Sequence, residues 1–133
     1  DIIFTNAVLE HVYYSDFENV IKQFQRVLKK DGYMSHQIDL KDHLGGSLNN
    51  LRFSKKIWET DLFKTSGFYT NRIRYKKMNK IFNKYGFKEV RSNITKWNDL
   101  PIKKDKLDHE FRNLDTEDLL ISGFFIKMLR NKT

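Results

Sequence analysis

The sequence has no cysteine, one proline and six glycines among its 133 residues. Without cysteine, disulfides, thiolate metal sites and a cysteine nucleophile are all excluded. The scarcity of proline and glycine, together with 39% hydrophobic residues, argues against a disordered chain and for a packed core. No apolar run approaches the roughly 20 residues of a membrane span, and no signal-peptide pattern is present. We therefore expect no membrane association and a cytoplasmic protein.

Acidic residues are fewer than basic ones, and the formal net charge is +8. A nucleic-acid-binding surface needs its positive charge in a cluster. Here the basic residues are spread from Lys22 to Lys132 among acids and asparagines, and they are densest between Arg72 and Lys84. The basic residues of that stretch have helical spacing, which favours the solvated face of an amphipathic helix. Nucleic acid is therefore not the partner we expect first.

The first third of the chain has the pattern of a strand, a helix and a second strand. An apolar run at 2–4 predicts a buried parallel strand. Ser15 and Glu18 have capping-box spacing at the start of an amphipathic helix, and Gly32 is its expected left-handed stop. A second strand is predicted at 33–38. The connections between these strands and the helix are short. A strand, a helix and a strand joined in this way form a right-handed crossover, with the two strands parallel.

The rest of the chain continues the α/β pattern as a single domain, or part of one. The stretch 96–114 is expected to be irregular, with one helical turn near 108–111. Glycine and capping patterns predict a short helix capped by Ser54, a helix at 73–85 stopped by Gly86, and strands at 87–94 and 123–129.

Three short motifs follow one another along the chain: Asp1-Ile-Ile-Phe-Thr-Asn-Ala-Val-Leu-Glu-His-Val12, Arg26-Val-Leu-Lys-Lys-Asp-Gly-Tyr33 and Tyr85-Gly86-Phe87. In this order and spacing they resemble class I S-adenosylmethionine-dependent methyltransferases of the type 11/12 kind. The first resembles the family's fourth strand and the turn after it. The second is similar to its "RVLKPGG" joint, although Lys-Asp replaces the commoner Pro-Gly. The third resembles the end of the helix before the sixth strand.

The resemblance implies a fold class for the whole of residues 1–133. The chain would be the C-terminal half of a Rossmann-like methyltransferase fold, a single partial domain with an inserted helical segment at about 48–70. Its strands would lie in the order 4-5-7-6, with the last strand antiparallel and helices on both faces. The strand at residues 1–6 would form an apolar edge, so we expect self-association through it or an altered packing of residues 1–12.

The family binds its cofactor chiefly through a Gly-rich loop after its first strand and an acidic residue that ends its second. This sequence has no such loop, because Gly45-Gly46 follows the wrong strand and is interpreted as a flexible turn. The resemblance therefore implies a fragment that is itself inactive and binds S-adenosylmethionine weakly or not at all.

The cofactor wall that the resemblance leaves consists of Asn6, Ala7 and Leu9. Asn6 follows a strand at its carboxyl end, where parallel sheets bind ligands, although an Asx turn is an equal alternative. His11 and Glu10 are the candidate catalytic pair. A histidine titrates near neutral pH, and beside a carboxylate it could orient a substrate or take a proton. The alternative is a turn histidine bonded to the backbone.

Asp39 and His43 follow the second strand, and Tyr69 and Arg72 follow the inserted segment. All four are candidate substrate-binding residues, and an arginine there could clamp an anionic acceptor. The alternatives are a polar loop and surface charge. His36, Asp39 and His43 have metal-ligating side chains, but His36 lies within a strand, so no metal site is predicted.

The leading hypothesis is transfer of a methyl group from S-adenosylmethionine to a small-molecule acceptor, with His11 as the base. Two alternatives come from other classes of function. One is a non-catalytic interaction module that pairs through its strand edge. The other is a basic nucleic-acid-binding domain.

Overall fold

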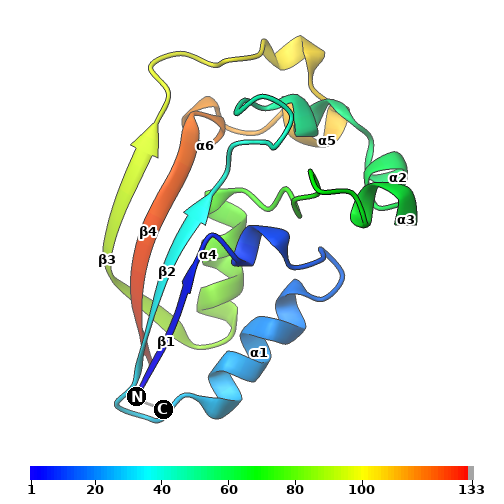
Figure 1. The fold of residues 1–133 in the computed structure, drawn as a ribbon. Helices are drawn as coiled ribbons and strands as arrows, with labels where there is room; N and C mark the ends of the chain where they lie inside the picture. Colours follow the sequence, from blue (N-terminus) through cyan, green and yellow to red (C-terminus); the bar gives the residue numbers. More distant parts are fainter. Residues whose placement is uncertain (132–133) are drawn as a thin grey trace.

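A four-stranded sheet forms the centre of the protein, whose computed structural model describes residues 1–131. The strands lie in the order β1 (Ile2–Asn6), β2 (Tyr33–Asp39), β4 (Ile121–Arg130) and β3 (Phe87–Lys96). β1 is parallel to β2, and β4 is antiparallel to both β2 and β3 (Figure 1). The predicted strand order 4-5-7-6, with its last strand antiparallel, is confirmed.

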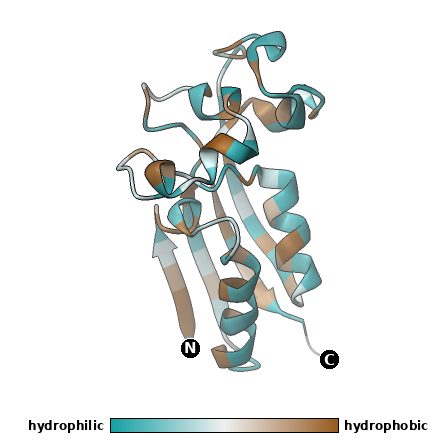
Figure 2. Cartoon of the chain, turned by 90° about the vertical axis from the view of Figure 1, so that its right-hand side faces the viewer, coloured by the Kyte–Doolittle hydropathy of each residue, from teal (hydrophilic) through white to brown (hydrophobic). Residues whose placement is uncertain are grey.

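Two long helices, α1 (Phe17–Val27) and α4 (Tyr75–Lys84), cover the same face of this sheet (Figures 1 and 2). Their side chains meet, with the rings of Phe17 and Phe82 6.4 Å apart. The prediction of helices on both faces is therefore wrong for residues 1–131. The reason is topological: both crossovers, β1–α1–β2 and β2–α4–β3, move along the sheet in one direction. Right-handed crossovers in one direction place their helices on one face.

The core lies between this face and the two helices. Residues of β2 and β4 alternate into it, which is the period of a strand with one covered face. The fully buried side chains that meet there are Met34, His36, Ile38, Phe124 and Ile126 from the strands, and Phe17, Ile21, Met78 and Phe82 from the helices. On the other face large apolar groups are exposed, with Phe4 75% and Leu129 42% accessible to solvent.

Single helical turns connect the strands beyond the carboxyl ends of β1 and β2 (Figure 1). They are η1 (Leu9–His11), η2 (Asn49–Arg52), α2 (Lys55–Trp58), α3 (Asp61–Lys64), η3 (Lys104–Lys106), α5 (His109–Arg112) and α6 (Thr116–Leu119). A second apolar cluster joins η2, α5 and α6, and is formed by Leu48, Leu51, Leu107, Phe111 and Leu119. No helix among residues 1–131 has the length and apolar character needed to cross a membrane.

The start of α1 differs from the capping-box prediction. Its N-cap is Asp16, and no side chain caps the helix. Glu18 instead accepts hydrogen bonds from the Nζ of Lys84 at 2.5 Å and the hydroxyl of Tyr85 at 2.8 Å. The capping box is wrong because this carboxylate joins α1 to α4, a contact that no local pattern encodes.

The two predicted glycine stops have different outcomes. Gly86 follows α4 with φ +78°, as a left-handed stop requires, and is confirmed. Gly32 is not in the left-handed region, so that prediction is wrong. It is glycine for a different reason: a Cβ there would lie 2.7 Å from the Cδ1 of Leu28 and 2.8 Å from the main-chain oxygen of Asp1.

Candidate functional site

Polar residues gather where β1 and β2 end side by side. Asn6 closes β1 and is exposed, while Asp39 closes β2 and accepts a hydrogen bond from the amide of Lys41 at 2.9 Å. Ala7 has φ +52°, a strained value for a residue other than glycine, and its amide donates to the oxygen of Gln37 at 2.9 Å. An open cavity of about 270 Å³ lies here, bordered by Asn6, Ala7 and Asp39.

The turn η1, shortly after β1, carries the exposed His11, which is not among the residues that border this cavity. Its Nδ1 lies 3.1 Å from the main-chain oxygen of Tyr69, and its ring meets that of His43 edge-on, with 5.0 Å between the centroids. A carbonyl oxygen only accepts, so Nδ1 donates the hydrogen. In the neutral ring Nε2 then carries the lone pair, and this is the nitrogen that can take a proton.

The loop that carries His43 is ordered by the buried carboxylate of Asp42. It accepts hydrogen bonds from the amides of Leu44 at 2.9 Å and Ser47 at 3.2 Å, and also from that of Asn49. Three amides on one carboxylate fix a polar loop whose own sequence would leave it mobile. The exposed His43 therefore has a defined position next to His11.

Glu10 turns inward rather than toward the cavity that Asn6 and Ala7 border. Its side chain is 2% exposed, and one carboxylate oxygen accepts from the amide of Asp39 at 3.3 Å. Burial raises the pKa of the Glu10 carboxyl above its ordinary value. The other oxygen has no hydrogen-bond partner within residues 1–131. The structure thus places Glu10 as a link between η1 and the end of β2.

Tyr69 also lies behind the site rather than in it. Its buried hydroxyl donates to the carboxylate of Glu59 at 3.0 Å and accepts from the amide of Tyr14 at 3.1 Å. Burial is the main cause that raises the pKa of this phenol. Tyr69 contributes its main-chain oxygen to His11, and its side chain joins Glu59, within the insertion, to Tyr14, which follows η1.

Arg72 is 7% exposed and is not a free clamp for an anion. Its Nη1 donates to the oxygens of Asn50 at 3.1 Å and Phe53 at 2.7 Å. The guanidinium lies 5.0 Å from the ring centre of Trp58 and 4.9 Å from that of Phe111. Burial lowers its pKa, and its φ of +60° is strained. Most of its bonding is therefore internal.

Asn71 has a role in the site that the sequence did not predict. Its side-chain amide donates to the main-chain oxygens of Leu9 at 2.8 Å and Val12 at 2.9 Å, and its backbone N–H donates to the main-chain oxygen of Glu10 at 2.7 Å. These bonds hold η1, and with it His11, in place. An asparagine at a joint gives no signal of contacts to a turn about sixty residues earlier.

Arg74 also has a structural role that the sequence did not predict. It is fully internal, and its guanidinium donates to the main-chain oxygens of Leu40, Asp118, Leu119 and Ile121. Burial lowers its pKa to about 10. It joins the end of β2 to the start of β4.

The predicted cofactor-wall residue Leu9 lies in the core, and so does His36, for which no site was predicted. Leu9 is buried and does not border the cavity of Asn6 and Ala7, and its main-chain oxygen accepts from the side chain of Asn71. His36 is stacked between Phe24 and Phe82, with ring centres 5.7 Å and 6.1 Å away. Its Nδ1 lies 2.8 Å from the Thr5 hydroxyl, which keeps it apart from any grouping with His43.

Comparisons with known proteins agree with this geometry. A family model described as a methyltransferase domain matches residues 1–35, which hold β1, η1, α1 and the start of β2. A search of curated proteins found no match.

One similar solved structure is a chain from the complex between the Haloferax volcanii Trm112 methyltransferase activator and a protein assigned as a methyltransferase. The likeness covers 100% of this chain and 54% of that chain, with a TM-score of 0.54 and 8% identity. At this identity the likeness concerns the fold, and this chain spans about half the length of that relative.

Proposed function

We propose that this class I methyltransferase-like domain forms the acceptor-facing wall of a methyltransferase site, at the edge where β1 and β2 end. The observation that carries the proposal is the orientation of His11, whose Nδ1 is held by the Tyr69 oxygen at 3.1 Å. This leaves Nε2 as the basic nitrogen of the neutral ring, on a residue that is exposed to solvent. His11 then takes the proton from the hydroxyl or amine of an acceptor as that group becomes a nucleophile.

Asp39 and His43 are the groups proposed to meet a small-molecule acceptor, since both lie at this edge and neither is buried. Glu10 is proposed as a positioning residue, because its carboxylate bonds to the Asp39 amide rather than pointing to solvent. Tyr69 and Arg72 are proposed to support this wall: Tyr69 bonds to His11 through its main-chain oxygen, and Arg72 bonds to the main chain of the insertion. Asn71 holds the turn on which His11 stands.

The residues present fit one wall of an S-adenosylmethionine site and not the whole of it. Asn6 and Ala7 border the open cavity, but the Leu9 side chain does not. Gly45 and Gly46 have no neighbouring atoms within 4 Å of an added Cβ, so they form no close cradle for a ligand. We therefore propose that this chain by itself binds S-adenosylmethionine weakly or not at all, and that its own part is the acceptor side.

Titration of the isotope-labelled chain with S-adenosylhomocysteine, followed by NMR, tests this proposal. We expect a dissociation constant of about 1 mM or weaker. Shift changes should be confined to residues 5–11 and 37–43. Micromolar binding would contradict the incomplete cofactor site. Shift changes that spare both segments, even at saturating ligand, would place the site elsewhere and overturn the proposal.

A second candidate, a module that pairs through its strand edge, is favoured by the exposure of β1. Ile2 and Phe4 are 53% and 75% exposed, and β1 has a strand partner on one side only within residues 1–131. The related Haloferax chain was solved with an activator protein, which supports a protein partner for this chain as well.

Sedimentation velocity tests the pairing through β1. A dimer that Phe4→Lys dissociates would support it, with Leu62→Lys as the matched control, because Leu62 is 78% exposed on α3. A monomer at high concentration, or equal effects of the two substitutions, would exclude self-association through this edge.

A further inference from the structure

A second and larger cavity, of about 480 Å³, lies beside the start of α4. Its walls come from α2, α4 and the region between α5 and α6, and it shares no residue with the open cavity that Asn6 and Ala7 border. The side chains that give it its character are Tyr14, Lys55, Lys77, Lys80, Phe111 and Leu114. Its volume is that of a small-molecule site.

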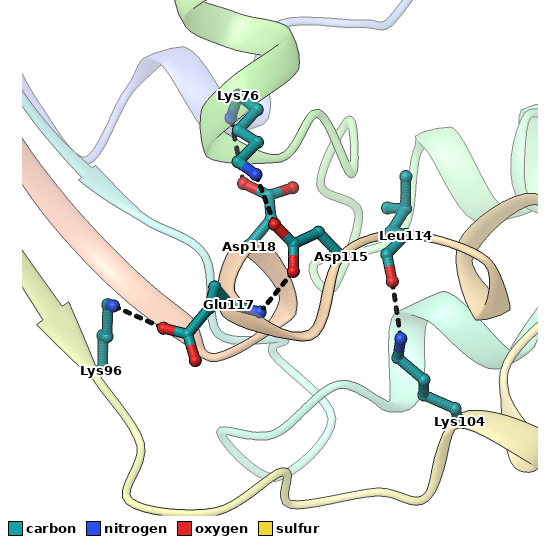
Figure 3. Close-up of polar contacts among 7 residues, drawn as sticks. All are labelled: Lys76, Lys96, Lys104, Leu114, Asp115, Glu117 and Asp118. Carbon is teal, nitrogen blue, oxygen red and sulfur yellow. Dashed lines mark hydrogen bonds and ion pairs between the residues drawn. The ribbon is translucent and has the colours of Figure 1, made fainter.

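Several charged groups around this cavity are already engaged. Lys76 pairs with Asp115 at 2.5 Å, and its amide donates to Asp118 at 3.0 Å (Figure 3). Arg74 donates through Nη1 and Nη2 to main-chain oxygens, although its Nε has no partner within residues 1–131, and Glu59 accepts from the Tyr69 hydroxyl. These groups cannot meet a ligand without breaking the contacts that hold the walls.

Three lysines remain available. Lys55, Lys77 and Lys80 form no ion pair with any carboxylate of residues 1–131. Two of them are arranged around one ring: the Nζ of Lys55 lies 4.2 Å from the ring centre of Tyr14, and the Nζ of Lys77 lies 2.6 Å from its hydroxyl. Tyr14 is thus in contact with two ammonium groups that have no carboxylate partner within residues 1–131, and both would be attracted to an anion in the cavity.

Behind these lysines the cavity has a buried cation. Arg72 borders the cavity and is only 7% exposed to solvent. Its Nε has no hydrogen-bond partner within the described chain. The Nε of Arg74, which borders the same cavity, is unpaired as well, so two buried donors here have no acceptor within residues 1–131. Phe111 and Leu114 supply apolar surface next to it.

We propose that this cavity binds a small anion, a phosphate ester or a carboxylate, that carries an aromatic or apolar body. The acidic group lies among Lys55, Lys77 and Lys80, and the body packs on Phe111 and Leu114. Glu59 and Glu110 also border the cavity, so a chain of phosphates is repelled where a single anionic group is not. A small ligand is therefore favoured over nucleic acid. The proposal does not depend on the reaction site at His11.

Calorimetry with 4-methylumbelliferyl phosphate as the probe tests the site, with neutral 4-methylumbelliferone and inorganic phosphate as comparisons. The double variant Lys77→Gln/Lys80→Gln removes two of the free charges. The control Lys22→Gln/Lys88→Gln removes the same charge from exposed positions outside the cavity. We expect the first pair to weaken binding at least about tenfold and the second less than about twofold, with amide shifts at Tyr14 and Phe111 on titration.

Four outcomes would overturn the proposal: no binding of the aryl phosphate, equal binding of the neutral compound, equal losses in the two double variants, or shifts that spare Tyr14 and Phe111. A single-stranded oligonucleotide that binds more tightly as its length increases would also overturn it. In that case the positive charge of the chain as a whole, rather than this cavity, would be the binding determinant.

Discussion

The Nδ1 of His11 lies 3.1 Å from the main-chain oxygen of Tyr69, although the two residues are 58 positions apart. This contact brings the turn after β1 against the end of the inserted helical segment. It also fixes which ring nitrogen carries the hydrogen, since a carbonyl oxygen can only accept. The orientation of the candidate base is thus set by the main chain of a distant segment.

The first prediction concerns the protonation of this ring. Nitrogen-15 NMR of the chain at pH 8 should show His11 as the Nδ1–H tautomer, because only that form bonds to the Tyr69 oxygen. His109, which is exposed and lies beside Asp108, serves as the reference histidine. A dominant Nε2–H form at His11 would contradict the contact and remove the proposed base.

A second prediction addresses the residue that holds η1. Asn71→Ala would leave the oxygens of Leu9 and Val12 without their donor in a buried place. We expect a loss of about 2–4 kcal/mol in the free energy of unfolding, measured in urea, since each unpaired buried group costs about 1–3 kcal/mol. The control is Asn49→Ala, whose side chain makes one long bond of 3.5 Å to Arg52. Equal stability of the two variants would show that Asn71 does not hold the turn.

These contacts mark the limit of what the sequence could predict. The strands, the two long helices and the stop at Gly86 follow from apolar spacing and glycine chemistry, which are local. The bonds of Asn71 and Arg74, and the join of Glu18 to Lys84, connect segments far apart in the chain, and no local pattern encodes them.

The placement of both helices on one face is different, because crossover handedness alone could have predicted it. The expectation of two covered faces came from the resemblance to a complete domain. The strand order within this chain was sufficient to exclude it for residues 1–131.

The buried His36 predicts a dependence of stability on pH. Burial lowers its pKa to about 4 from an ordinary 6.5. Between these two pH values His36 is protonated in the unfolded chain but still neutral in the folded chain. The free energy of unfolding that is fully present above pH 6.5 is therefore lost as the pH falls toward 4. We expect a loss from this group of about 2–3 kcal/mol between pH 7 and 4.5.

The variant His36→Phe keeps an aromatic ring between Phe24 and Phe82 but cannot titrate. Its free energy of unfolding should therefore fall less than that of the parent between these two pH values, while His109→Phe, at an exposed position, should follow the parent. Identical pH profiles for all three proteins would mean that His36 is not the group responsible.

Glu10 should show the opposite dependence. Burial raises the pKa of this carboxyl, so the folded chain keeps the proton to higher pH than the unfolded chain does. The native state is then favoured at low pH and loses stability as the pH rises from 4.5, because a charge without full pairing is left in the interior.

Glu10→Gln, of the same shape, should be at least as stable as the parent at pH 8. That advantage should shrink as the pH falls to 4.5, whereas Glu110→Gln, at an exposed position, should change little at either pH. A Glu10→Gln protein that is clearly less stable than the parent at pH 8 would mean that the ionised carboxylate is itself stabilising. The Glu10 carboxylate oxygen that has no partner within residues 1–131 would then have to accept a hydrogen bond from another group in solution.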